Sequence, residues 1–181
     1  IIVTLGTMMI ARGVAQVVTQ GAQRNTSLPD SFGVIGNANI GNSPIKISVG
    51  IMAILVIIAI LIERKTIFGR RTYLIGANKR AAKLSGIKVG RHLFNLYLTS
   101  AFLAGVTGIL LASEFKAGVS GRATGYEFDA LVITLLGGTS IDGGFGSVIG
   151  TVVGALILAV VTSAATGMLL SPDWQFLLKG I

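Results

Sequence analysis

Two apolar runs flank a segment that carries almost all of the chain's net charge. Residues 47–62 and 93–112 are each about long enough to cross the hydrocarbon core of a bilayer as a helix. Residues 63–92, called here the basic segment, hold nine Lys or Arg side chains and one Glu, so their net charge equals the +8 of the whole chain. Because Lys and Arg resist translocation, a loop of this kind stays on the cytoplasmic side of a membrane. The pattern therefore restricts the chain to a membrane-spanning fold with the basic segment inside.

Composition agrees with this restriction. Hydrophobic residues make up 52% of the chain and charged residues 12%, about half of the charged fraction of a typical soluble domain. Residues 1–18 and 147–170 form two further apolar runs of spanning length. The sequence predicts an all-α, polytopic membrane helix bundle, with residues 19–44 as a polar external loop. The basic segment is explained by topology, so we expect no nucleic-acid partner.

The two ends of the sequence lie in apolar stretches. The chain starts without Met inside its first apolar run, and residues 174–181 resemble the start of a further span. We therefore expect one transmembrane domain over residues 1–181 that belongs to a longer membrane subunit. The sequence has no cysteine, which excludes disulfides, thiolate metal sites and cysteine nucleophiles.

A short apolar element at residues 127–138 cannot cross a bilayer. Its apolar part, residues 130–136, spans only about 10 Å as a helix. We predict a half-helix or re-entrant element buried in protein, followed by a glycine-rich turn at residues 137–146. The direction of the last span depends on where this turn lies, and periodicity leaves both directions open.

Polar side chains near this element and in the first run are candidates for a translocation pathway. Glu127 and Asp129 precede the half-helix, where they stabilise a helix N-terminus through the dipole or else line the outer mouth of a pathway. Arg12 lies inside the first apolar run, where an Arg must reach the interface or find a partner, and Gln16 lies one turn later on the same face. The candidate pathway residues are Arg12, Gln16, Glu127, Asp129, Thr139 and Ser140.

The basic segment contains a pattern typical of a short helix. Asn78 is a favourable N-cap, Ala81, Ala82 and Leu84 favour helix, and Gly86 suits a left-handed C-cap. A helix of two turns is unstable alone, so it must pack against something. Two interpretations stay open: an amphipathic helix held on anionic lipid, and a docking helix for a cytoplasmic partner.

Glycines spaced by four, Gly146, Gly150 and Gly154, predict one helix face without side chains. That face permits close helix packing, or alternatively a sliding surface for alternating access. The glycine spacing does not match a phosphate-binding loop, and no G-K-[ST] follows, so ATP binding by this chain is not expected. The single histidine, His92, lies at the junction of the basic segment and a span and is interpreted as an interfacial residue. No metal-ligand or catalytic triad pattern is found.

Several motifs occur in a fixed order along the chain. They are TLGTMMIARG at residues 4–13, YLIGANKRAAKLSGI at 73–87, GYEFDA at 125–130, LGGTS at 136–140, GGFG at 143–146 and GTVVGALIL at 150–158. This ordered set resembles the permease subunits of bacterial ABC importers for ribose and related sugars. Related permeases for branched-chain amino acids share the general plan. The family usually has an acidic residue after the coupling Asn, whereas Lys79 and Arg80 stand here.

The resemblance implies a non-enzymatic, cofactor-free transport subunit in the bacterial inner membrane that moves a pentose or related monosaccharide. It also implies a second permease subunit, an ATP-binding subunit on the cytoplasmic side and an extracytoplasmic solute-binding protein. The coupling residues would be Asn78, Lys79, Arg80, Ala81, Ala82, Leu84, Ser85 and Gly86. A permease for branched-chain amino acids and a passive channel or facilitator are the alternatives, and a facilitator has no need of a capped helix in the basic segment.

Overall fold

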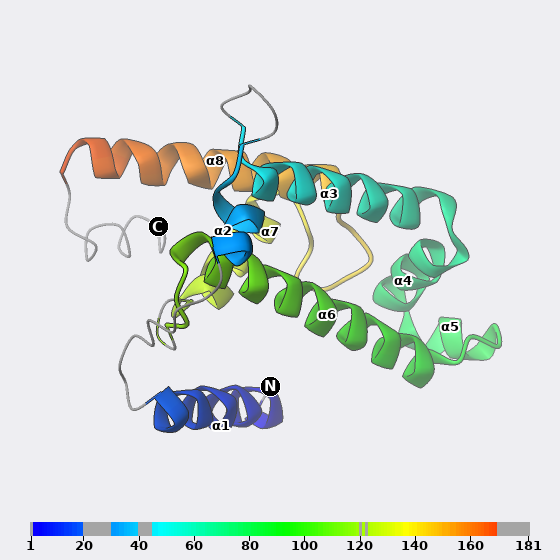
Figure 1. Ribbon diagram of the computed structural model, residues 1–181. Helices are drawn as coiled ribbons and strands as arrows, with labels where there is room; N and C mark the ends of the chain where they lie inside the picture. Colours follow the sequence, from blue (N-terminus) through cyan, green and yellow to red (C-terminus); the bar gives the residue numbers. More distant parts are fainter. Residues whose placement is uncertain (1, 20–29, 40–44, 120, 122, 170–181) are drawn as a thin grey trace. The chain divides into compact units, whose positions relative to one another are not determined.

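The computed structural model describes residues 2–19, 30–39, 45–119, 121 and 123–169 (Figure 1). The regular structure of these residues is helical, and one isolated antiparallel bridge joins Asn39 and Lys46. An all-α fold was predicted and is confirmed. The predicted start of a further span, residues 174–181, lies outside the described residues.

Four described helices are long and apolar enough to cross a membrane. They are α1 (Ile2–Thr19), α3 (Ile47–Lys65), α6 (Val89–Phe115) and α8 (Val148–Gly167). Each contains most of one predicted apolar run. Arg64 and Lys65 fall in the last turn of α3, where cations interact favourably with the helix dipole. At the other end of the basic segment the boundary differs from the predicted apolar run, because α6 begins within the basic segment and includes Arg91 and His92.

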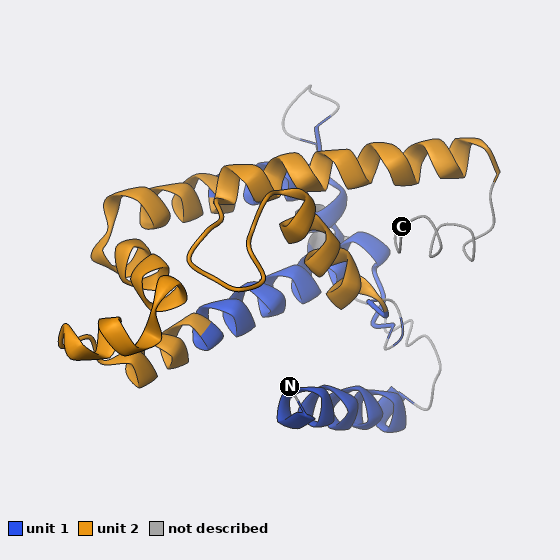
Figure 2. Cartoon of the chain, turned by 180° about the vertical axis from the view of Figure 1, so that it is seen from behind, with its two compact units in different colours: residues 1–54, 97–124 blue, residues 55–96, 125–181 orange. Residues whose placement is uncertain are grey.

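The chain divides into two compact units, coloured separately in Figure 2. Unit 1 comprises residues 1–54 and 97–124, and unit 2 comprises residues 55–96 and 125–181. The long helices α3 and α6 each contribute to both units.

Unit 1 contains a helix that the sequence did not predict, α2 (Asp30–Asn37), inside the polar segment expected to be a loop. Ser113 of α6 explains its position. This fully buried side chain donates its hydroxyl proton to the Phe32 carbonyl and accepts a hydrogen bond from the Gly36 N–H at 2.8 Å. The Asn37 side chain at the end of α2 adds a second link, because its amide donates to the Glu114 carbonyl at 2.7 Å. Tertiary hydrogen bonds thus stabilise a helix whose composition favours a loop.

Unit 2 contains three short helices, α4 (Ile67–Ala77), α5 (Lys79–Leu84) and α7 (Tyr126–Leu136). Thr66 caps α4 by accepting the Gly69 N–H. At 1.5 Å per residue, the 11 residues of α7 reach about 16 Å, roughly half of a hydrocarbon core. The predicted short element is therefore a short helix.

Glycines bring α7 and α8 into backbone contact. A methyl group built on Gly154 would overlap the carbonyl oxygen of Ile133, and one built on Gly150 would overlap the carbonyl oxygen of Gly137. The prediction for Gly146 needs correction, because α8 begins at Val148 with Ser147 as its N-cap. Gly146 therefore lies in the preceding turn, where a methyl group would lie 2.9 Å from Thr139.

Candidate functional site

Helix α5 is defined by its caps. The Asn78 side-chain oxygen accepts hydrogen bonds from the N–H groups of Arg80 and Ala81, both at 3.0 Å. At the other end Gly86 adopts a positive φ of 78°, and the Ile87 N–H returns to the carbonyl of Ala82 at 3.1 Å. The six-residue helix is thus closed at both ends by the chemistry expected of Asn and Gly.

One face of α5 packs against the chain itself. Ala82 is 4% exposed and forms a small core with Ile75 of α4 and Val89 of α6. Ala82 therefore does not belong to the outward surface, which corrects its place among the coupling residues. Leu84, by contrast, is 89% exposed. The other predicted coupling residues are also exposed: Asn78, Lys79, Arg80, Ala81, Ser85 and Gly86.

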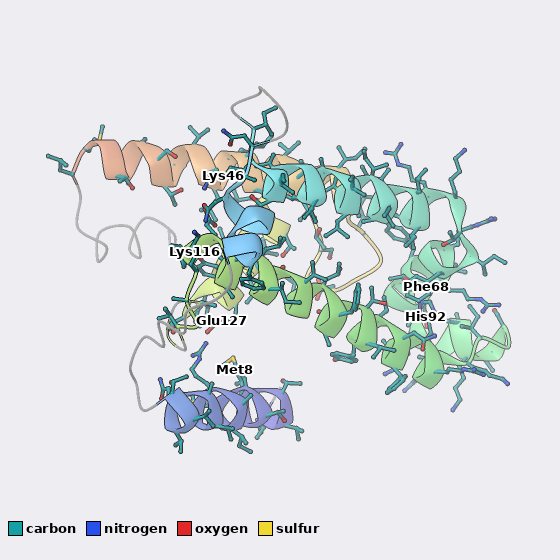
Figure 3. All side chains as sticks on the ribbon, in the orientation of Figure 1. Met8, Lys46, Phe68, His92, Lys116 and Glu127 are labelled. Atoms are coloured by element: carbon teal, nitrogen blue, oxygen red, sulfur yellow. The ribbon has the colours of Figure 1, made fainter. Side chains whose placement is uncertain are left out.

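His92 is buried against α4 rather than lying at an open interface. His92 is 7% exposed, and its ring centroid lies 4.6 Å from that of Phe68. Both side chains are labelled in Figure 3. Its Nε2 atom is 2.9 Å from the Thr72 hydroxyl oxygen, and that hydroxyl donates its proton to the Phe68 carbonyl at 3.0 Å. The Thr72 hydroxyl thus connects the His92 ring to the backbone of α4. His92 is a structural joint between α4 and α6.

A second joint connects α3, α4 and α8. The Glu63 carboxylate accepts a hydrogen bond from the Tyr73 hydroxyl through Oε1 and from the Val148 N–H through Oε2, the latter at 3.1 Å. The Tyr73 oxygen also lies 2.6 Å from the carbonyl oxygen of Gly146. We call this group, formed by Glu63, Tyr73, Gly146 and Val148, the tyrosine joint. A carboxylate is well placed at the first N–H groups of a helix because they are unpaired and carry positive partial charge.

Sequence reasoning missed the tyrosine joint. The available signal in the sequence was Glu63, the single acid among nine bases. In the structure its partners are a tyrosine and a helix N-terminus. Hydrogen bonding to the Glu63 carboxylate, reinforced by burial and by the carboxylate charge, raises the pKa of Tyr73 to about 12, while Arg64 acts weakly in the opposite direction.

The glycine-rich turn between α7 and α8 is packed on α4. A methyl group built on Gly76 of α4 would lie 2.6 Å from the Gly144 nitrogen, so the two backbones are in contact. Within the turn, the Thr139 N–H donates to the Thr134 carbonyl and the Ser140 N–H to the Phe145 carbonyl, both at 3.0 Å. The basic segment and the α7–α8 pair are therefore mechanically linked inside unit 2.

The candidate pathway residues are divided between the units. Glu127 and Asp129 occupy the first turn of α7, and the Glu127 carboxylate accepts the Gly125 N–H at 3.2 Å. Thr139 and Ser140 lie in the turn of unit 2, whereas Arg12 and Gln16 belong to α1 in unit 1. Neither unit alone gathers them into one site. The described part of the chain contains no cluster of metal-ligating side chains.

Comparisons with known proteins identify the class. A family profile described as "Branched-chain amino acid transport system / permease component" matches residues 1–181. The chain belongs to this permease family. No solved structure matches the permease chain.

Curated relatives of the permease chain are named for sugars. The ribose import permease protein of Bacillus subtilis (strain 168) is 35% identical over 182 residues, which cover 99% of this chain and 56% of that protein. The L-arabinose transport system permease protein of Escherichia coli (strain K12) is 35% identical over 181 residues, covering 100% and 54%. The xylose transport system permease protein of Haemophilus influenzae is 37% identical over 130 residues, covering 72% and 35%. The chain spans about half the length of the curated relatives it matches.

Family membership and the four apolar helices together make this permease a multi-pass protein of the inner membrane. Its relatives are permease components, a class that moves solutes rather than transforming them.

Proposed function

We propose that the chain forms the coupling half of a transmembrane permease in an ATP-driven importer of pentoses. The observation that carries this proposal is the capped helix α5, held by Ala82 on the chain's own core with Leu84 almost fully exposed. A helix of six residues does not persist by itself, so the two caps and the packed Ala82 hold the exposed residues of α5 in a fixed geometry, as a docking surface requires. The relatives named for ribose, arabinose and xylose support a pentose as the substrate.

The contacts of unit 2 suggest how motion passes through the permease. A partner ATPase that moves α5 also moves α4, because Ala82 packs against Ile75. Helix α4 contacts the glycine-rich turn at Gly76 and the start of α8 through the tyrosine joint. The turn is continuous with the backbone-packed pair of α7 and α8. Docking on the basic segment is thereby converted into displacement of half-spanning and spanning helices.

The importer would contain further parts. Hydrolysis takes place on a separate ATP-binding subunit, a second permease subunit completes the pathway, and a solute-binding protein delivers the sugar from the opposite side. The basic segment then faces the cytoplasm and residues 19–44 face outward, as the charge asymmetry favours. Arg12, Gln16, Glu127, Asp129, Thr139 and Ser140 remain our proposal for polar residues of the pathway.

Transport in proteoliposomes tests this function. Vesicles containing the full permease, its ATP-binding partner and its solute-binding protein are supplied with labelled ribose, arabinose, xylose or leucine, with and without ATP. We expect uptake of at least one pentose, with ATP present only. Uptake of leucine alone would favour the branched-chain amino acid alternative that the family description suggests. Equal sugar uptake without ATP would indicate a passive channel.

Crosslinking tests the docking role of α5. Single cysteines replace Ala81, which is exposed, and Ala82, which is buried, in the assembled importer. We expect a short crosslinker to join the Ala81 position to the ATP-binding subunit, while the neighbouring Ala82 position serves as the buried control. An actively transporting complex that gives no crosslink from Ala81 or from Leu84 would refute docking at α5.

A further inference from the structure

A cavity of about 450 Å³ lies where α4, the turn after α5 and the start of α6 meet. Its polar lining comes from Arg71, Lys88, Arg91, His92 and Asn95. All of these residues belong to unit 2. No function assigned above uses this cavity, which we call the Arg71 cavity.

The charge of the Arg71 cavity is not neutralised by the protein. Arg71 belongs to α4, Lys88 to the turn after α5 and Arg91 to α6, and no carboxylate lines the cavity. Glu63, the single acid of the basic segment, is engaged by Tyr73 and by the N-terminus of α8. Among the described residues, none of the three cations forms an ion pair. Three positive charges thus converge on a space large enough for a phosphate-bearing headgroup.

Apolar side chains continue from this cavity along α6. Phe94 and Leu98 follow Arg91 by three and seven residues, so they lie on the same face of the helix. Phe94 is 65% exposed and Leu98 is 59% exposed. A water-soluble anion would use the cations but not these side chains. A phospholipid would use both, with its headgroup in the cavity and its acyl chain along α6.

We propose that the Arg71 cavity binds the headgroup of an anionic phospholipid of the inner leaflet. This inference rests on the orientation in the proposed function, with the basic segment at the cytoplasmic surface. A lipid in this position contacts Lys88, which lies three residues after the Ser85 C-cap of α5, and Arg91, which lies in the first turn of α6. The bound lipid therefore stabilises the turn between α5 and α6, which must change shape when α5 moves.

Lipid retention by the full permease tests the site. The protein is purified in detergent, exchanged into nanodiscs of phosphatidylglycerol or phosphatidylcholine, and assayed for tightly bound lipid by native mass spectrometry. We expect retained phosphatidylglycerol on the unmodified permease. The double variant Arg71→Gln/Arg91→Gln should bind it about 25-fold more weakly, since each Lys or Arg near an anionic surface contributes about fivefold.

Two further variants make the comparison specific. Arg64→Gln/Lys65→Gln removes the same charge at the end of α3, outside the cavity, and should retain the lipid. Arg71→Lys/Arg91→Lys keeps the charge and should restore most of the binding, which a folding defect would not allow.

Three results would overturn the proposal. Equal lipid retention by the two glutamine double variants would show that binding follows net charge alone. Full competition by inorganic phosphate would assign the cavity to a soluble anion. Unchanged lipid retention with loss of the ATP-binding subunit from Arg71→Gln/Arg91→Gln would make the cavity a protein contact. Lipid binding without ATP-driven sugar uptake would instead contradict the proposed function and leave the lipid site standing.

Discussion

Tyr73 is the residue through which α4 reaches both α3 and the entrance to α8. Its hydroxyl has one proton and two acceptors within reach, the Glu63 carboxylate and the Gly146 carbonyl. The hydroxyl can donate its proton to either acceptor. The contact can therefore persist when the start of α8 moves, because the proton changes from one acceptor to the other. A hydrogen bond that changes acceptor tolerates movement better than a fixed ion pair does.

Removing this hydroxyl should uncouple the importer. Tyr73→Phe keeps the ring and deletes a hydrogen bond to a charged group, an interaction of about 1.5 to 3 kcal/mol. We expect roughly a tenfold loss of sugar transported per ATP hydrolysed, with unchanged assembly. The ratio is measured in proteoliposomes, and Tyr97→Phe on the exposed surface of α6 is the matched control. Equal losses in both variants would remove Tyr73 from the coupling mechanism.

The tyrosine joint should also respond to alkaline pH. The pKa of Tyr73 in the folded chain is about 12, above the value of 10 for an unperturbed tyrosine, so the folded state holds the proton more tightly. The corresponding stability is fully present below pH 10 and is lost as the pH rises through 12. In a titration of tyrosinate absorbance, Tyr73→Phe should lack the component that develops near pH 12. Persistence of that component in the variant would assign it to another tyrosine.

Among the helices, the contact of α7 with α8 gives the clearest prediction for the effect of a substitution on stability. Gly154 meets the backbone of α7 directly, so even a methyl group must displace a carbonyl. Gly154→Ala should lower stability by about 1 to 3 kcal/mol, and Gly154→Leu should prevent assembly. Gly167 lies on the same helix with no atom near its would-be methyl group, so Gly167→Ala should be neutral or stabilising, as alanine is in helices. Thermal unfolding in detergent measures the difference, and equal behaviour of the two alanine variants would show that α7 and α8 separate in the membrane.

The elements that the sequence predicted well are those set by local chemistry. Long apolar runs give α1, α3, α6 and α8, and the Asn78 and Gly86 caps give α5. The elements it missed depend on distant partners. Helix α2 is held by Ser113, 77 residues from Gly36, and the tyrosine joint links Tyr73 to Gly146 over 73 residues. Ala82 was included among the coupling residues because composition shows that a helix is Ala-rich but not which alanine is buried.

For the whole molecule, the charge asymmetry makes a topological prediction. A single cysteine at Lys79 should be protected from a membrane-impermeant thiol reagent in intact cells, and one at Asn39 should be labelled. The sequence has no cysteine, so the background is clean. Opening the cells should make Lys79 reactive, because the residue is exposed. Labelling of Lys79 from outside would invert the orientation and remove both the docking and the lipid proposals.

The glycine contact between α7 and α8 also determines how the two helices can move relative to each other. Contacts made of interlocking side chains can slip by exchanging rotamers, but a seam of bare backbone has no rotamers to exchange. We therefore predict that α7 and α8 move as one rigid body, which favours close packing over a sliding surface. Gly125, whose backbone is left-handed, directly precedes α7, so the chain can change direction there without straining the pair. We expect such a pair to tilt as a unit during transport, so that the size of its movement depends on the lengths of the two helices rather than on the packing between them.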